Sequence, residues 1–238
     1  MRRILVSGGS RGIGAAVVRR FCTNDDAVAF FYRADKEAAD SVSKSTGAVP
    51  LCCDVSNPDA VRTGYAAASE ALGGAPEILV NCAGVAHTGL FQDMTDVAWR
   101  QVIDTDLSGV FYLCRAAAPS MITAKRGRII NIGSMWGKVG AACEAAYSAA
   151  KAGVRGLTMA LAKELGPSGI TVNCIEPGLI DTDMNAALSA ADKQALIDET
   201  PLLRIGKPDD VAEVVFFLAS PGAAFITGQC LGIDGGIV

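Results

Sequence analysis

The stretch LVSGGSRGIG, residues 5–14, decides the fold expected for this chain. A short apolar run leads into glycines spaced G-x-x-x-G-x-G, at Gly8, Gly12 and Gly14, and an alanine-rich stretch follows. Such glycines allow positive φ angles and let backbone N–H groups approach a pyrophosphate closely where a strand meets a helix N-terminus. A glycine loop alone is also compatible with a simple tight turn. Its place after the first strand of an alternating chain favours a dinucleotide site.

Short apolar runs recur between helical stretches along the rest of the chain. They are bounded by Gly, Pro or polar residues, as is typical of strands buried on both faces of a sheet. The runs lie at residues 3–8, 27–33, 48–55, 77–84, 127–134, 170–178 and 230–236. Helical patterns lie at residues 12–24, 36–46, 57–72, 96–125, 145–166 and 209–219. This alternation predicts an α/β fold of the Rossmann type, a doubly wound sheet of about seven parallel strands with helices on both faces.

No linker or internal repeat divides the chain. We therefore expect a single dinucleotide-binding and catalytic domain over residues 1–238, with an excursion near the site at about 180–206.

Composition excludes several classes of protein. Half of the 238 residues are hydrophobic, and the formal net charge is -4 with no long run of Lys or Arg, so we expect no nucleic-acid partner. The eight cysteines are scattered without a C-x-x-C pair and His87 is the one histidine, so we expect neither disulfides nor a metal site. No apolar run is long enough to cross a bilayer, and no signal-peptide pattern stands at the N-terminus. We expect a cytoplasmic protein without membrane contact.

The end of the second predicted strand, FFYRAD at residues 30–35, bears on the choice of dinucleotide. An acidic residue there binds the ribose 2′-hydroxyl of NAD, whereas arginine suits the 2′-phosphate of NADP. Arg33 occupies this place, and Arg11 lies in the glycine loop. The two arginines favour NADP, although Asp35 leaves a hydroxyl contact open if the strand ends later.

Tyr147 and Lys151 lie four residues apart in a predicted helix, one above the other on the same face. A free tyrosine has a pKa of about 10 and is a weak base at neutral pH. An ammonium about 5 to 6 Å away favours the phenolate by about 3 kcal/mol, so we expect Lys151 to lower the pKa of Tyr147 by roughly 2 units. Ser134 ends a predicted strand, where its hydroxyl can bind a carbonyl oxygen while Tyr147 protonates that oxygen and a reduced nicotinamide gives hydride.

Together these motifs resemble those of the short-chain dehydrogenase/reductase family over essentially the whole chain. The resemblance rests on SGGSRGIG at 7–14, DV at 54–55, NCAG at 81–84, Ser134, YSAAK at 147–151, PGLIDTDM at 177–184 and ITGQCLGIDGG at 226–236. It implies a catalytic group of Ser134, Tyr147 and Lys151 with residue 106, and it implies that Lys151 also binds the nicotinamide ribose.

The resemblance implies further cofactor contacts. Asp54 and Val55 would edge the adenine, residues 81–84 would line the cofactor floor, and residues 177–182 would hold the nicotinamide amide. The expected cofactor-binding residues are Gly8, Ser10, Arg11, Gly12, Ile13, Gly14, Arg33, Asp54, Val55, Asn81, Ala83, Gly84, Tyr147, Lys151, Pro177, Gly178, Ile180 and Thr182.

Three residues depart from the family pattern. Ser7 replaces the usual threonine, and either hydroxyl can make a local hydrogen bond; Cys82 replaces an asparagine, which we interpret as packing. Asp106 stands where the family has an asparagine that shapes a helix kink and steadies a water on the proton relay to the lysine. A carboxylate cannot donate a hydrogen bond, so we expect a working but altered relay.

Within the family the chain is most similar to 3-oxoacyl-acyl-carrier-protein reductases, through PLLRIGKPDDVAEVVFFLAS at 201–220 among other features. We therefore expect NADPH-dependent reduction of a ketone, most simply a 3-oxoacyl thioester on acyl carrier protein. Trp136, Cys143 and Glu144 are also similar to elongation factor P 5-aminopentanone reductases, whose ketone is borne by a translation factor. An alternative of another class is a non-catalytic NADP-binding sensor.

The predicted helices at 96–125 and 145–166 are long, alanine-rich and weakly amphipathic, so each can bury a second face against a partner subunit. The resemblance implies a homotetramer built through these helices and the C-terminal strand.

Overall fold

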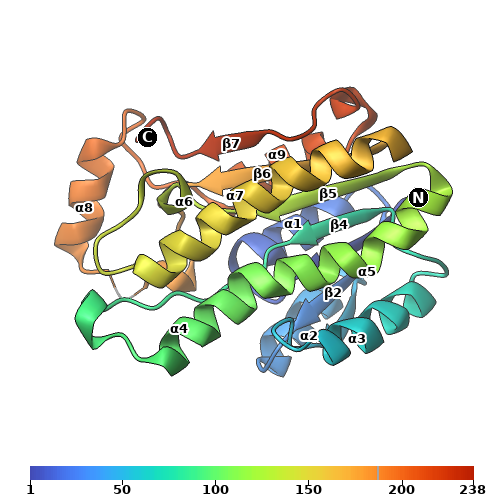
Figure 1. Ribbon diagram of the computed structural model, residues 1–238, viewed down its shortest axis with the longest axis horizontal. Helices are drawn as coiled ribbons and strands as arrows, with labels where there is room; N and C mark the ends of the chain where they lie inside the picture. Colours follow the sequence, from blue (N-terminus) through green and yellow to red (C-terminus); the bar gives the residue numbers. More distant parts are fainter. Residues whose placement is uncertain (187) are drawn as a thin grey trace.

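A computed structural model of the protein describes residues 1–186 and 188–238. Within these residues, seven strands form one parallel sheet in the order β3-β2-β1-β4-β5-β6-β7 (Figure 1). The strands are β1 (Arg3–Ser7), β2 (Ala27–Tyr32), β3 (Val49–Cys52), β4 (Ile78–Asn81), β5 (Gly127–Ile132), β6 (Ile170–Pro177) and β7 (Cys230–Ile233). The predicted doubly wound α/β fold is confirmed.

Helices cover both faces of this sheet. They are α1 (Gly12–Cys22), α2 (Lys36–Thr46), α3 (Pro58–Ala71), α4 (Asp96–Ile103), α5 (Gly109–Ala124), α6 (Trp136–Val139), α7 (Ala145–Leu165), α8 (Ala190–Glu199) and α9 (Pro208–Leu218). Short helical turns lie at Phe91–Asp93, Gly166–Ser168, Asp183–Asn185 and Pro221–Ala223. No helix among the described residues is both long and apolar enough to cross a membrane.

Alternation along the strands divides the core into two layers. Ile4 and Val6 of β1 face a cluster that includes α1 and α9, whereas Leu5 faces a cluster with α3, α5 and α7. Successive side chains of a strand point to opposite faces, so a strand with only apolar residues supplies both layers. All three of these side chains are fully buried.

The predicted helix over residues 96–125 is interrupted in the structure. A π-helical turn at Asp104–Ser108 separates α4 from α5, and Gly109 begins the second helix. A Cβ atom at Gly109 would lie 3.0 Å from Val55 Cγ2, so the helix passes close to the loop after β3. The turn carries Asp106 into the interior, where its exposed fraction is 0%. π-Helical turns are frequent at functional sites.

The two ends of the segment at residues 180–206, which follows β6, lie side by side. Ile180 and Gly206 form an isolated parallel bridge, and the Asp181 N–H donates to the Gly206 carbonyl at 2.9 Å. Between them lie the turn at Asp183–Asn185 and helix α8. Both ends of this segment are thus fixed at the carboxyl edge of the sheet.

Candidate active site

The loops after β1 and β4 meet where the strand order reverses. β1 pairs with β2 on one side and with β4 on the other, so its carboxyl end is a topological switch point, where open α/β sheets bind ligands. The Ser7 hydroxyl accepts hydrogen bonds from the backbone N–H groups of Cys82 and Ala83 at 3.0 and 3.1 Å. The hydroxyl of Ser7, which replaces the usual threonine, therefore makes the local hydrogen bonds expected of it. These bonds hold the loops after β1 and β4 against each other.

The glycine loop packs too closely against its surroundings for side chains at Gly8 and Gly14. Gly8 has φ of +70°, and a Cβ there would lie 2.8 Å from the Ala83 Cα; a Cβ at Gly14 would lie 2.1 Å from the Gly8 carbonyl oxygen. Gly12 lies next to Thr182, whose Cγ2 would be 3.3 Å from an added Cβ. The loop leads directly into the N-terminus of α1, an arrangement that suits a pyrophosphate.

Three further predicted cofactor-binding residues lie in or next to this loop. Ser10 and Ile13 are half-buried, and Arg11 is exposed at the residue that precedes α1.

The end of β2 carries the arginine on which the prediction of NADP rests. The strand ends at Tyr32, and Arg33 is exposed and absent from the ion pairs of the described residues. Asp35, the residue that would bind a ribose hydroxyl, instead caps α2 by accepting from the Ala38 N–H at 2.9 Å. Asp54 is also engaged, since its Oδ1 accepts from the N–H and hydroxyl of Ser56. The exposed cation at the end of β2 is thus the Arg33 guanidinium, whose geometry suits a phosphate.

Asn81 lies deeper than a cofactor contact requires. Its side chain is 1% exposed, and its Nδ2 donates to Asn131 Oδ1 at 2.8 Å, while Asn131 Nδ2 donates to Thr158 Oγ1 at 2.9 Å. This chain of amides joins β4, β5 and α7. The Nδ2 of Asn81 is thus committed to the scaffold, whereas its buried Oδ1 has no hydrogen-bond partner among the described residues.

Ser134, Tyr147 and Lys151 converge beside the carboxyl end of β5. The Lys151 ammonium donates to the carbonyl of Ile132, the last residue of β5, at 3.1 Å, and it lies 5.4 Å from the centre of the Tyr147 ring. The Ser134 hydroxyl oxygen accepts from the Trp136 N–H at 3.1 Å, and a hydrogen bond from the Ser134 side chain lowers the pKa of Tyr147. A substrate oxygen can accept the Ser134 hydrogen in place of Tyr147. Ser134 and Lys151 are buried, with exposed fractions of 7% and 4%.

Asp106 contacts this group directly. Its Oδ2 lies 3.1 Å from the Lys151 Nζ, and its Oδ1 accepts from the Val85 N–H at 2.8 Å. A Cβ at Gly84 would lie 2.7 Å from Oδ2 and 3.5 Å from the lysine Nζ. The carboxylate thus forms a buried ion pair with the lysine. The sequence predicts an altered proton relay at Asp106 but does not predict its ion pair with Lys151.

Lys151 lowers the pKa of Tyr147, as expected, but the net pKa is raised. Burial raises the pKa of the Tyr147 hydroxyl, the ammonium of Lys151 lowers it and the Asp106 carboxylate raises it again, so that the net pKa lies above the usual 10.0. A prediction from distance alone includes neither desolvation nor the opposing carboxylate. Burial likewise raises the pKa of Asp106, although Lys151 lowers it, while Asp106 and Tyr147 raise the pKa of Lys151 against the effect of burial.

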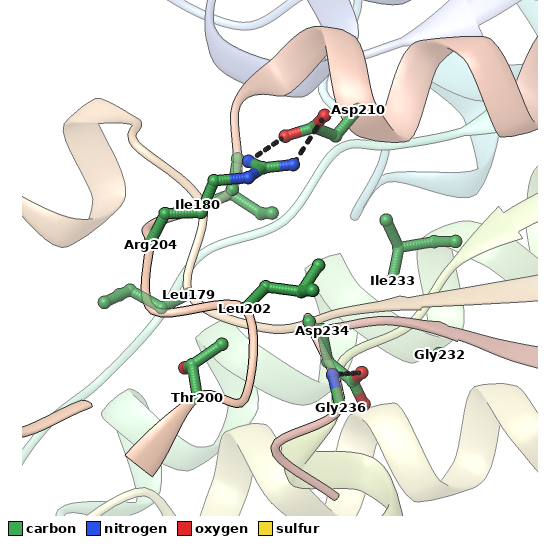
Figure 2. A pocket seen from close by; sticks show the side chains of 12 residues that line it. Leu179, Ile180, Thr200, Leu202, Arg204, Asp210, Gly232, Ile233, Asp234 and Gly236 are labelled. Carbon is green, nitrogen blue, oxygen red and sulfur yellow. Dashed lines mark hydrogen bonds and ion pairs between the residues drawn. The ribbon is translucent and has the colours of Figure 1, made fainter. Parts of the chain in front are cut away.

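The residues after β6 lie between the glycine loop and the C-terminal segment. Pro177 and Ile180 are buried, Gly178 packs against Asp234, and Thr182 faces Gly12. A pocket of about 480 Å³ opens between this segment and residues 232–236 (Figure 2). Leu202 and Ile233 contribute apolar surface, and Arg204 pairs with Asp210 at one side. Leu179 and Ile180, from the predicted range 177–182, line this pocket, whereas Ser134, Tyr147 and Lys151 are not among its lining residues.

One cluster of possible metal ligands escaped the sequence analysis. Among the described residues, Cys174, Glu176 and Cys230 place their ligand atoms within 4.8 Å of one another. The two cysteines are direct partners on β6 and β7, which the spacing along the chain does not reveal. Arg155 binds both oxygens of the Glu176 carboxylate, so that carboxylate is already neutralised by a protein cation.

Comparison with known proteins agrees with this geometry. A sequence model of the family described as enoyl-(acyl carrier protein) reductase matches residues 8–238. The 3-oxoacyl-[acyl-carrier-protein] reductase of Pseudomonas aeruginosa is 40% identical over 238 residues, with 98% of this chain and 96% of that protein covered.

Solved structures give the same picture of the fold. A 3-oxoacyl-[acyl-carrier protein] reductase from Brucella melitensis matches with a TM-score of 0.92 at 33% identity, covering 99% of this chain and 90% of that one. A protein called ribose-5-phosphate isomerase from the same species matches with a TM-score of 0.92 at 35% identity, covering 99% and 92%. Likeness of fold alone therefore does not assign the reaction. With relatives of this identity along nearly its whole length, the chain belongs to the short-chain dehydrogenase/reductase family and is an oxidoreductase.

Proposed function

We propose that this protein uses NADPH to reduce the 3-oxo group of an acyl thioester on acyl carrier protein to a secondary alcohol. The observation that carries the proposal is the convergence of Ser134, Tyr147 and Lys151 at the carboxyl edge of the sheet. The relatives from Pseudomonas aeruginosa and Brucella melitensis, both called 3-oxoacyl reductases, support this substrate class.

The proposed cofactor is NADP, held by the glycine loop, with Arg33 and Arg11 at the ribose 2′-phosphate. Two exposed arginines and a capping Asp35 support the phosphorylated dinucleotide over NAD. Lys151 and residues 177–182 are proposed to hold the nicotinamide end. The bound dinucleotide supplies hydride to the substrate carbon.

The protein's own residues handle the substrate oxygen and its proton. Ser134 donates a hydrogen bond from its hydroxyl to the carbonyl oxygen. Tyr147 transfers the proton that completes the alcohol. A raised pKa keeps the Tyr147 hydroxyl protonated at neutral pH, as an acid requires. The ammonium of Lys151, fixed by the Ile132 carbonyl, stabilises the phenolate that remains after proton donation.

Consumption of NADPH by the purified protein tests this assignment. We expect the fastest turnover with an acetoacetyl thioester on acyl carrier protein, slower turnover with a small acetoacetyl ester, and none with elongation factor P that bears a 5-aminopentanone group. Faster reduction of the modified elongation factor would overturn the substrate assignment. Among the residues that resemble the second class of reductase, Glu144 could pair with the amine of that substrate, but it is half-buried and burial raises the pKa of its carboxyl group, which weakens it as a partner for a cation.

We further propose that the protein is a homotetramer in the cytoplasm. Large apolar side chains stand exposed on α5 and α7, among them Phe111 and Met159, and others lie on β7 and the turn before it, where Leu231 is 37% exposed and Phe225 is fully exposed. Monomers rarely expose so many large apolar groups on adjoining elements. The free state of all eight cysteines suits a reducing compartment. A monomer by light scattering at micromolar concentration would contradict the assembly.

A further inference from the structure

A buried carboxylate and a buried ammonium meet behind the proposed proton donor. Asp106 comes from the π-helical turn and Lys151 from α7; their charged atoms are 3.1 Å apart, and both residues are almost completely excluded from solvent. The second oxygen of Asp106 is held by the Val85 N–H. The carboxylate is therefore fixed in place by the backbone after β4 and does not depend on the lysine for its orientation.

The charged groups around Tyr147 come from three elements. Lys151 lies one turn along α7 and Glu144 stands at the residue before that helix, whereas Asp106 approaches from the turn between α4 and α5. Glu144 is only half-buried, so water screens its effect. Lys151 is also near the thiols of Cys82 and Cys174. Burial raises the pKa of Cys82, and a hydrogen bond with Cys230 together with burial raises that of Cys174, so that both are neutral at physiological pH. Lys151 and Asp106 are thus the buried charges that face the phenol.

We propose that Asp106 is the counter-ion of Lys151 and keeps the Tyr147 hydroxyl protonated, so that the acid form that donates to a carbonyl persists to higher pH. This inference rests on the proposed function and adds what sets the protonation state of its proton donor. Asp106 acts through Lys151 and is a positioning residue in this scheme, because its contacts are with the lysine and the backbone at 84–85.

A count of buried charges gives the direction of the effect. With Asp106 ionised and Lys151 protonated, the neutral phenol leaves the group without net charge, and loss of the phenol proton would bury a net negative charge. If an amide replaces the carboxylate, the same group carries a net positive charge, and loss of a proton makes it neutral. Uncompensated buried charge is costly, so the native carboxylate opposes deprotonation and the amide favours it.

Replacement Asp106→Asn tests the proposal because the amide has nearly the shape of the carboxylate. The titration of Tyr147 is measured by ultraviolet absorbance of tyrosinate, as the difference between each protein and its Tyr147→Phe counterpart, which removes the signal of the other three tyrosines. We expect Tyr147 to titrate at lower pH in the variant. The matched control is Asp104→Asn, since Asp104 is an exposed carboxylate in the same π-helical turn, and its replacement should leave the titration unchanged.

The pH dependence of the catalytic rates should shift in the same direction as the titration of Tyr147. In Asp106→Asn, ketone reduction should begin to fall at lower pH than in the native enzyme, and alcohol oxidation should reach its plateau at correspondingly lower pH. A purely structural role for Asp106 would lower both rates without displacing either pH profile. Thermal unfolding monitored in parallel shows whether the variant remains folded.

A double-mutant cycle separates this account from its alternatives. Lys151 is the main group that opposes the burial-raised pKa of the Asp106 carboxyl, so we expect this carboxyl to be neutral in a Lys151→Met background, where the shift caused by Asp106→Asn should largely vanish. An unshifted Tyr147 titration in Asp106→Asn, or an equal shift without the lysine, would overturn the proposal. The titration needs no substrate, so it decides the role of Asp106 even if the thioester proves not to be the substrate.

Discussion

At the scale of single residues, we propose that Arg33 decides between the two nicotinamide dinucleotides. It is exposed at the end of β2, and the neighbouring acid, Asp35, is occupied as the cap of α2. Replacement Arg33→Ala should weaken NADPH binding by about 10- to 100-fold, the value of a lost charge-assisted contact with a phosphate, and change NADH binding little. Titration of each dinucleotide by fluorescence measures the two affinities.

A second exposed arginine provides the control for this prediction. Arg19 lies in the last turn of α1, away from the glycine loop, so Arg19→Ala should bind both dinucleotides as the native protein does. Equal weakening of NADPH and NADH by Arg33→Ala would show that Arg33 does not read the 2′-phosphate.

The same scale shows what the sequence reveals of the site and what it hides. Ser134, Tyr147 and Lys151 could be predicted, because a strand end and one helical turn fix their relative positions. The ion pair of Asp106 with Lys151 could not, since it depends on a π-helical turn that directs residue 106 inward. Nor could the net direction of the pKa shift of Tyr147, because desolvation follows from packing, which a spacing of four residues does not contain.

At the scale of elements, the strands could be predicted in full, because continuous apolar runs between turns have few other solutions in a chain of this kind. The helix over 96–125 was predicted without its break. A π-helical turn adds one residue to a helical ladder and leaves the apolar pattern nearly intact, so periodicity does not show it. The course of residues 180–206 also needed the structure, because the bridge of Ile180 with Gly206 joins residues far apart in the chain.

The glycine loop makes its own prediction at this scale. Gly8→Ala introduces a side chain at φ of +70° and 2.8 Å from the Ala83 Cα, where the loops after β1 and β4 touch. We expect a loss of about 1 to 2 kcal/mol of stability from the left-handed conformation and a further loss of dinucleotide affinity, because the loop must move. Urea unfolding and dinucleotide titration measure the two effects.

Gly47→Ala is the matched control. Gly47 has φ of +77° at the end of α2, with nothing within 4 Å of an added Cβ. It should lose a similar amount of stability and keep the affinity for the dinucleotide. If Gly8→Ala binds the dinucleotide as well as Gly47→Ala does, the close approach of the two loops is not part of the binding site.

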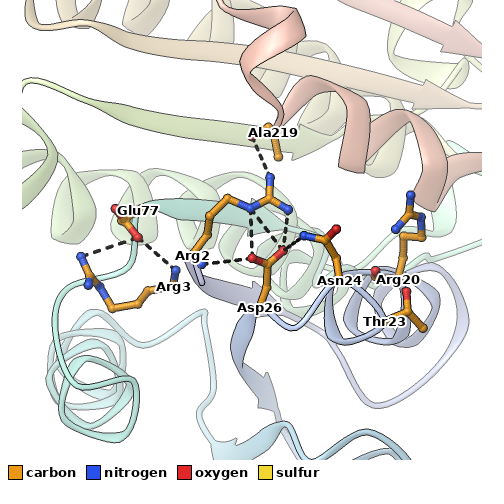
Figure 3. Close-up of polar contacts among 8 residues, drawn as sticks. All are labelled: Arg2, Arg3, Arg20, Thr23, Asn24, Asp26, Glu77 and Ala219. Atoms are coloured by element: carbon orange, nitrogen blue, oxygen red, sulfur yellow. Dashed lines mark hydrogen bonds and ion pairs between the residues drawn. The ribbon is translucent and has the colours of Figure 1, made fainter.

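At the scale of the whole molecule, Asp26 joins three parts of the fold (Figure 3). Its carboxylate, at the start of β2, accepts from the N–H and the guanidinium of Arg2 beside β1, and Arg2 also donates to the carbonyl of Ala219 after α9. Burial raises the pKa of Asp26, but the hydrogen bonds from Arg2 outweigh it, and the net pKa is lowered. The ionised form therefore stabilises the folded state.

The sign of this shift sets the pH range of its effect. A carboxyl group with a lowered folded-state pKa contributes stability above its unfolded pKa, near 4, and loses that contribution as the pH falls through the folded value. Asp26→Asn should cost about 2 kcal/mol at neutral pH, as expected for lost bonds to a charged group, and the difference from the native protein should shrink in acid. Urea unfolding across this pH range checks it. Asp40→Asn, which removes an exposed pair with Lys36, should cost much less at neutral pH.

The central claim, that Tyr147 gives its proton to the substrate oxygen, is tested most directly by the rate of ketone reduction in Tyr147→Phe. Phenylalanine keeps the ring packed against Lys151 and removes only the hydroxyl, so dinucleotide binding should persist while kcat for the 3-oxoacyl thioester falls by about 10²- to 10⁴-fold. A variant that binds the dinucleotide and reduces the ketone at the native rate would contradict the account.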